Sequence, residues 1–132
     1  KVFRFQDSYW MLTDEWHGMR VYRSKDCKTW EKQGLILDGP SKRADDTPSG
    51  AHGDVLVTKD REGKVEKAYV FYFTHPGREK HTAGKLDQNG VLPYAQRRSS
   101  IQVAELKFAD GKLTCNREED FDFFLPNPEA LK

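Results

Sequence analysis

The stretch MRVYRSKDCKTW, which runs from Met19 to Trp30, decides the fold. Its first half alternates apolar and polar residues, as a half-buried strand does, and the Ser-Lys-Asp that follows is typical of a tight β-connection. Trp30, just beyond this turn, predicts a buried aromatic side chain. Strand-like runs of similar character recur along the chain in two successive groups of four. We expect the first group at 2–5, 9–14, 19–23 and 29–37, and the second at 54–58, 68–74, 100–108 and 112–116.

The rest of the sequence also predicts an all-β fold. Val, Ile, Tyr, Phe and Trp concentrate in short runs that Gly, Asp, Asn and Pro separate, which is the composition of antiparallel strands and their turns. Helical signals are confined to a turn near 116–121 and a helical turn at 128–131, where Pro and Glu suit a first turn. Each group of four strands predicts an antiparallel meander. The two meanders fit either a β-sandwich or two neighbouring blades of a β-propeller.

The connections between the predicted strands are unequal. Most are tight, but the one at 75–98 is well beyond hairpin length, and long loops in compact domains usually carry function. Because meander strands alternate in direction, the two-to-three connection of each group and the link between the groups lie at one edge. A propeller brings the loops of its blades together at one face. The residues able to do chemistry fall mainly at one edge of the predicted sheets, and this favours propeller blades over a sandwich. The residues at this edge that are able to do chemistry are Asp14, Glu15, His17, the 38–50 loop, His52, Asp54, His75, Arg78, His81, Arg97 and Arg98.

Length and charge limit the classes of function. The 132 residues fit a single domain, in which we expect a blade at 1–37, a linker loop at 38–50, a blade at 51–118 and a C-terminal connection at 119–132. The 22 basic and 21 acidic side chains nearly cancel, so we expect neither nucleic acid nor a membrane as a partner. Two blades cannot close a ring, and the chain begins with Lys rather than Met. We therefore expect it to be part of a longer protein that supplies the remaining blades.

The two cysteines, Cys27 and Cys115, are too few for a disulfide framework. Both fall where the third strand of a group leads to the fourth, so they would lie in separate blades, where a bond between them is geometrically unfavourable. We expect two small buried thiols.

Several segments carry a resemblance to a known family. In the first group they are YWML at 9–12, VYRSKD at 21–26 and Trp30, and in the second group AHGDV at 51–55, YFTHPGR at 72–78 and RSSIQVA at 98–104. Together they resemble blades of the five-bladed β-propeller glycoside hydrolases of the family 43 type and their clan relatives. Cys27 stands where that pattern usually has Leu.

This resemblance implies hydrolysis of glycans derived from plant or microbial polysaccharides, by paired carboxyl groups. It also implies a secreted or periplasmic protein with a carbohydrate substrate. A structural divalent cation such as calcium at the propeller centre is the one cofactor it implies, with His52 as a candidate ligand. No catalytic metal ligand is assigned.

Three carboxylates are candidates for the chemistry. Asp54 stands at the start of an innermost strand, where the resemblance places a general base or a carboxylate that tunes the acid. Asp14 and Glu15 end a strand at the same edge and are candidates for binding sugar hydroxyls or supplying the acid, because Trp10 and Trp16 nearby would favour a protonated carboxyl. The Glu-Gly-Pro-like acid motif of the family has no counterpart in this sequence. Catalysis by this segment alone is therefore expected to be incomplete.

The candidate substrate-binding residues are aromatic or cationic. Trp16 offers a face on which a sugar ring can stack, although a Trp beside a loop also serves as a lid on the core. The imidazole of His52 lies two residues from Asp54, so in an extended strand the two side chains share a face. Arg97 and Arg98 lie at the entry to a strand. Their guanidinium groups favour binding of an acidic sugar such as a uronate, or else pair with Asp45, Asp46 or Glu79. The full set is Trp16, His17, His52, His75, Arg97 and Arg98.

Two functions from different classes remain open. The first is a glycoside hydrolase segment that uses Asp54 with Asp14 or Glu15. The second is a non-catalytic propeller segment that binds glycan or protein through the same residues but lacks the acid. A phosphate-binding Gly-rich loop, a Gly-x-Ser-x-Gly elbow and a His-Glu-x-x-His motif are all absent from the sequence, so other common mechanisms have little support.

Overall fold

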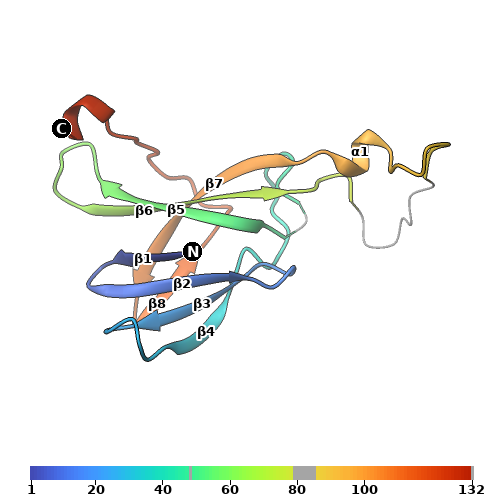
Figure 1. Ribbon diagram of the computed structural model, residues 1–132. Coiled ribbons are helices and arrows are strands. Elements are labelled where there is room, and N and C mark those ends of the chain that lie inside the picture. The colour runs from blue at the N-terminus through green and yellow to red at the C-terminus, as the bar shows by residue number, and fades with distance from the viewer. Residues whose placement is uncertain (48, 79–85, 132) are drawn as a thin grey trace.

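A computed structural model describes residues 1–47, 49–78 and 86–131 of the chain. The described residues form two four-stranded antiparallel sheets, each with its strands in sequential order (Figure 1). The first sheet consists of β1 (Val2–Phe5), β2 (Ser8–Asp14), β3 (Met19–Ser24) and β4 (Glu31–Ile36). The second consists of β5 (Ala51–Lys59), β6 (Glu66–Thr74), β7 (Ser100–Ala109) and β8 (Lys112–Cys115). Two single helical turns complete the elements, α1 (Tyr94–Arg97) and the 3₁₀ turn η1 (Pro128–Leu131).

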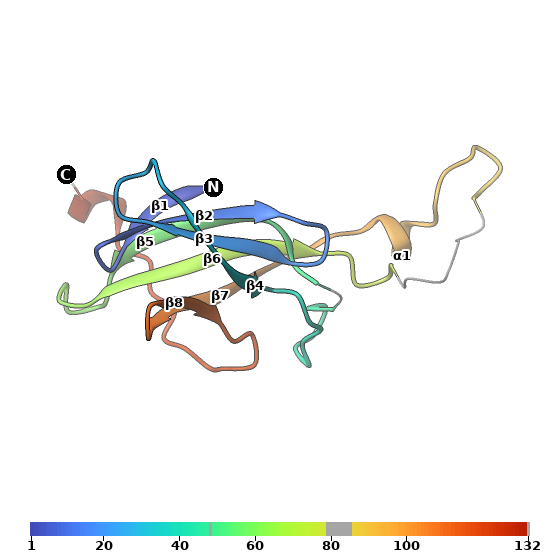
Figure 2. The same cartoon turned by 90° about the horizontal axis from the view of Figure 1, so that it is seen from below.

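The all-β prediction and the two four-stranded meanders are confirmed. The predicted turns after β8 and at the C-terminal end are confirmed as well, the first by a bond from the Glu119 N–H to the Asn116 carbonyl and the second by η1. One helical turn, α1, was not predicted. It lies in the connection between β6 and β7, and the described residues around it, 86–98, extend away from both sheets (Figure 2). The propeller architecture stays a prediction.

The two sheets pack face to face and repeat the same path side by side. The first strands of the two sheets, β1 and β5, lie against each other, and so do the last strands, β4 and β8 (Figures 1 and 2). A single apolar core fills the space between the sheets. Its most deeply buried members are Trp10, Leu12 and Val21 from the first sheet and Ala68, Val70, Ala104 and Leu106 from the second.

Strand β2 shows why this packing follows from the sequence. Ser8, Trp10 and Leu12 alternate with outward-facing residues, and all three are buried on the inner face. The indole N–H of Trp10, which would otherwise be unsatisfied in the core, donates to the Phe5 carbonyl at 2.9 Å. The large buried indole that anchors the first sheet is therefore Trp10. Trp30, which the sequence predicts to be buried, is only half-buried.

The turn from Ser24 to Lys28 is held by two short polar side chains. The Ser24 hydroxyl accepts the backbone N–H of Asp26 and of Cys27, and the Asp26 carboxylate accepts the N–H of Lys28 and of Thr29, both at 2.9 Å. The Thr29 bond is the main reason that the pKa of Asp26 lies below its usual value. Serine and aspartate thus provide the turn chemistry that the sequence predicts.

Burial of both thiols was predicted, and this is wrong for Cys27. Its backbone takes a positive φ of 59° at the tip of the turn, which directs the side chain away from the core, and the residue is exposed. Cys115 is partly buried, and burial raises the pKa of its thiol to about 12.

We expect the two thiols to differ strongly in reactivity. At pH 8, iodoacetamide should alkylate Cys27 at the rate of an ordinary exposed thiol. Cys115 should react about a thousandfold more slowly, because its raised pKa leaves little thiolate. Mass spectrometry of Cys27→Ser and Cys115→Ser over time measures each rate separately, and both variants should react at equal rates in urea. Equal rates in the folded protein would contradict the buried environment of Cys115.

The predicted linker at 38–50 is anchored in the second sheet rather than lying loosely between the sheets. Asp46 is fully buried, and its carboxylate accepts the Tyr72 hydroxyl at 2.8 Å and the Arg117 Nη1–H at 2.7 Å. Burial, followed by the hydrogen bond to Asp46, raises the pKa of Tyr72 above its usual value. The linker therefore fixes the position of the chain just before β5.

Candidate functional site

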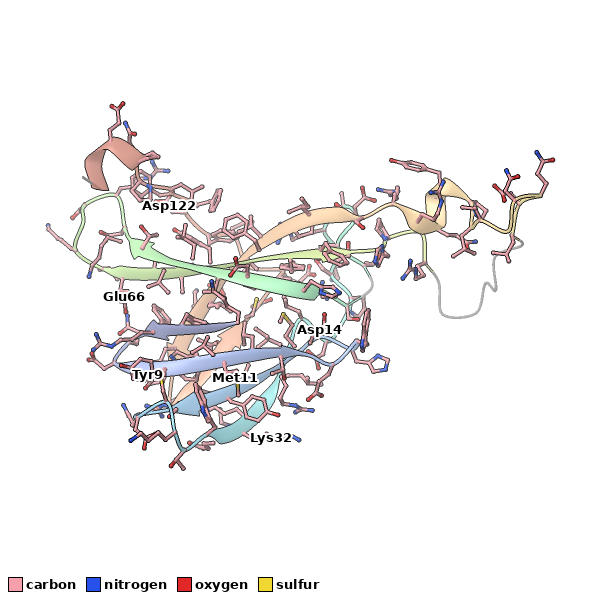
Figure 3. All side chains as sticks on the ribbon, viewed as in Figure 1. Tyr9, Met11, Asp14, Lys32, Glu66 and Asp122 are labelled. Carbon is pink, nitrogen blue, oxygen red and sulfur yellow. The ribbon has the colours of Figure 1, made fainter. Side chains whose placement is uncertain are left out.

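The candidate site lies at the edge where the β2–β3 connection meets the start of β5 and the end of β6. Five residues come together there, and we call them the rim cluster: Asp14, Trp16, His52, Phe73 and His75. Figure 3 shows Asp14 at the end of β2, close to the start of β5. Residues from three separate segments thus form one surface, as the alternation of strand directions predicts.

Asp14 organises the backbone of the rim cluster. One of its carboxylate oxygens accepts the Trp16 N–H at 2.8 Å, and the other accepts the His52 N–H at 2.9 Å. Both of these residues have a positive φ, 62° for Trp16 and 49° for His52, which is a costly conformation for a residue with a side chain. The two hydrogen bonds compensate for this strain and hold the rings in place.

A β-bulge directs the His52 side chain. Ala51 pairs with Phe73 and Asp54 pairs with Phe71, so β5 carries one residue more than β6 between these two pairs. Bulges of this kind are frequent beside functional sites because they change the direction of a side chain. The bulge places the imidazole of His52 within reach of Asp14, whose carboxylate oxygen lies 3.7 Å from its Nε2.

The rings of the cluster contact one another in series. The His52 imidazole stacks on Phe73 with a centroid separation of 4.9 Å and meets Trp16 edge-on at 5.5 Å. Phe73 in turn meets His75 edge-on at 5.1 Å. The Nδ1 atom of His75 lies 3.2 Å from the Arg98 carbonyl, which fixes the imidazole at the end of β6.

A small pocket opens beside these rings. Its volume is about 120 Å³, and its lining consists of Trp16, Ser49, Ala51, Phe73, His75 and Arg78. The Trp16 side chain is 72% exposed, although indole is a large and mostly apolar group that folding normally covers. The arrangement offers a flat apolar face next to a few polar groups, which is the usual make-up of a ligand site.

A larger hollow of about 820 Å³ lies elsewhere, between the β5–β6 hairpin and residues 124–127. Of its four charged side chains, that of Lys59 makes no hydrogen bond or ion pair within the described residues. The other three serve the fold: Arg61 forms a two-point ion pair with Asp122, Asp60 accepts the Lys64 N–H, and Glu66 accepts the Gln6 N–H. These three groups have internal partners, so the rim cluster is the stronger candidate.

Two of the three carboxylates predicted for catalysis, Glu15 and Asp54, form ion pairs. Both Glu15 oxygens accept N–H groups of the Arg20 guanidinium, at 3.1 and 2.9 Å, and these bonds lower the pKa of Glu15. Asp54 lies 2.8 Å from the Lys1 ammonium, which is the main cause of its lowered pKa, followed by the Val55 N–H. Both groups are therefore ionised at neutral pH. Neither suits the role of a proton donor, and the role of Asp54 as a base stays a prediction.

The remaining predicted binding residues lie outside the pocket lining. The Arg98 guanidinium forms a two-point ion pair with Asp45, which is one of the alternatives that the sequence left open. The Arg97 Nε–H donates to the Leu92 carbonyl at 2.7 Å. His17 is exposed and makes no hydrogen bond or ion pair within the described part of the chain. His81 and Glu79 lie outside the described residues.

The structure brings Asp14, Trp16, His52 and His75 together, as the sequence predicts, and adds Phe73. Phe73 alternates along β6 with the buried Tyr72 and Thr74, so its outward direction was readable from the strand period. The sequence held no sign that the His52 ring would stack on it, because that contact depends on the bulge.

Neither a metal centre nor a membrane span is found in the described residues. Within 1–47, 49–78 and 86–131, no three His, Cys, Asp or Glu side chains gather closely enough to hold a metal ion. Over the same residues, every helix is too short to cross a bilayer. No protein-family model matches the chain, and no curated protein matches it to a significant degree.

Proposed function

We propose that this chain provides a glycan-binding surface at the rim cluster, as part of a glycoside hydrolase-like protein. The observation that carries the proposal is the exposed face of Trp16 at the mouth of the pocket. The C–H face of a sugar ring packs well on such an indole and covers apolar area that water otherwise contacts. The ring series behind Trp16 and the hydrogen bonds of Asp14 hold the indole ready for a ligand, which lowers the entropic cost of binding.

The polar groups of the pocket complement this apolar platform. The Ser49, His75 and Arg78 side chains carry hydrogen-bonding atoms that suit sugar hydroxyls, and they come from the pocket lining itself. A few convergent polar groups around an apolar surface are sufficient to orient a small ligand.

A binding role fits the carboxylates of this segment better than a complete hydrolytic role. Hydrolysis by paired carboxyl groups needs one that remains protonated near neutral pH. The ion pairs of Glu15 with Arg20 and of Asp54 with Lys1 lower both pKa values and so oppose that state. In this proposal the proton donor belongs to another part of the protein, and the present chain holds the glycan.

Replacing Trp16 with alanine should weaken glycan binding by about tenfold, because the stacking face is lost. The test is calorimetric titration of the protein with a panel of neutral and acidic plant oligosaccharides. Trp16→Phe should retain part of the affinity, since a smaller aromatic face remains.

The matched control is Trp30→Ala, which removes the half-buried tryptophan beside the turn at the opposite edge of the first sheet. It should bind the panel as the wild type does, after circular dichroism has shown that it is folded. The proposal fails if no oligosaccharide binds the wild type, or if Trp16→Ala and Trp30→Ala bind equally well.

A further inference from the structure

We infer that the rim cluster recognises acidic sugars, and that Arg78 binds their anionic group. This inference rests on the proposed glycan binding and names the chemical class of the ligand. It moves the anion-binding role from Arg97 and Arg98, for which the sequence predicts it, to a third arginine that lines the pocket.

Arg78 differs from Arg20 and Arg98 in how its charge is used, and from Arg97 in lining the pocket. Arg97 also binds no carboxylate of the described residues, but its Nε–H donates to the Leu92 carbonyl outside the pocket lining. The guanidinium groups of Arg20 and Arg98 each bind a carboxylate, Glu15 in one case and Asp45 in the other. Arg78 is exposed and forms no ion pair with any carboxylate of the described ranges. Its planar fork of N–H donors is therefore available to a carboxylate that a ligand brings.

Among the residues that the structure describes, no acidic side chain lines the pocket. Its lining residues are all neutral or cationic in type. Asp14, the one acid of the rim cluster, is outside the pocket lining, and its two oxygens accept the backbone N–H groups of Trp16 and His52. Asp45 is engaged by Arg98. The one formal charge among the described lining residues is therefore that of Arg78, which favours an anion, and the His75 imidazole adds hydrogen-bonding atoms beside it.

The backbone that carries Arg78 is held close to the pocket. The Arg78 N–H donates to the His75 carbonyl at 2.9 Å and closes a tight turn directly after β6. At Gly77 the chain passes so near α1 that an added Cβ would lie 1.9 Å from the Ala95 carbonyl oxygen. Only glycine permits this approach, so the turn is clamped between the end of β6 and α1.

Size and shape also fit an acidic ring. A pocket of about 120 Å³ is too small to enclose a complete sugar, but it accommodates a charged substituent and the adjoining ring edge. The rest of the ring would lie over the exposed indole of Trp16. A uronic acid has its carboxylate at the edge of the pyranose ring, so one residue can stack and form the ion pair at the same time.

The test compares oligogalacturonate with its methyl ester, which has the same shape without the charge. By calorimetry in low salt, the wild type should bind the acid about tenfold to a hundredfold more tightly than the ester. Arg78→Gln should lose this preference while retaining the affinity for the ester, and Arg78→Lys should keep part of it. Arg97→Gln is the matched control, because Arg97 lies outside the pocket lining, and it should discriminate as the wild type does.

The outcomes separate this inference from the proposed function. Equal binding of acid and ester by the wild type would overturn the inference and leave glycan binding intact. If Arg78→Gln still prefers the acid over the ester as strongly as the wild type does, the inference is overturned as well. If the wild type binds neither the acid nor the ester, nor any oligosaccharide of the neutral panel, the proposed function itself is overturned. A sulfated galactan oligosaccharide forms the third arm: if it binds more tightly than oligogalacturonate and loses this advantage in Arg78→Gln, Arg78 recognises a sulfate rather than a carboxylate.

Discussion

Replacing Asp46 with alanine is expected to lower the free energy of unfolding by about 3–5 kcal/mol, because it removes the buried carboxylate that neutralises Arg117. Arg117 is 6% exposed, and its Nη1 lies 2.7 Å from the Asp46 carboxylate. The buried hydroxyl of Tyr72 loses its acceptor in the same change. Urea denaturation followed by tryptophan fluorescence measures the loss.

The neighbouring acid supplies the control for Asp46. Asp45 also binds an arginine, but the pair with Arg98 is open to solvent, so Asp45→Ala should cost much less stability. Changing Asp46 to Leu together with Arg117 to Met should restore part of the loss, since apolar side chains of similar size can replace a buried pair. Equal losses for Asp45→Ala and Asp46→Ala would contradict the buried network.

Trp10→Ala is expected to destabilise the fold by about 3–5 kcal/mol, through lost apolar burial and the cavity that remains. Trp10 is fully buried at the centre of the first sheet, and its ring meets Phe108 of the second sheet at a centroid separation of 5.6 Å. The change therefore weakens the contact between the sheets as well as the first sheet itself. Urea denaturation, monitored by far-ultraviolet circular dichroism, measures this loss of stability. This signal does not depend on the fluorescence of Trp10, which the substitution removes.

Domains of this kind are commonly stable by only about 5–15 kcal/mol, so Trp10→Ala is expected to be only marginally folded. Trp10→Phe keeps much of the volume and should lose less. The contrast is Trp16→Ala, which removes an exposed indole and should leave the unfolding midpoint nearly unchanged. A loss at Trp16 as large as that at Trp10 would show that the Trp16 ring packs into the fold.

The part of the candidate site that follows from strand order was predictable. Asp14 ends β2, His52 begins β5 and His75 follows β6, and alternating strand directions place these three at one edge whatever their side chains are. The cation with which each candidate carboxylate forms an ion pair was not predictable in the same way. Asp54 could be placed at a strand start, but its ion pair with Lys1 depends on how β1 lies against β5.

The same limit applies to the linker. Asp45 and Asp46 are adjacent and chemically identical, and the sequence treats both as loop charges. In the structure one is half-exposed and binds Arg98, while the other is fully buried against Tyr72 and Arg117. Arg43, three residues before Asp46, lies 3.7 Å from it, but Tyr72, Arg98 and Arg117 lie 26 to 71 residues away from the acid that each one binds, so the burial of Asp46 depends on distant parts of the chain.

The amino-acid sequence by itself determined the strands, their order and the tight turns, because apolar alternation and hydrogen bonding by Ser24 and Asp26 act over a few residues. Tertiary structure alone decided which tryptophan is buried, where the bulge turns His52, and which arginine lines the pocket with its charge available to a ligand. The reason is physical: these outcomes depend on the packing of two sheets against each other, and that packing joins residues far apart in the chain.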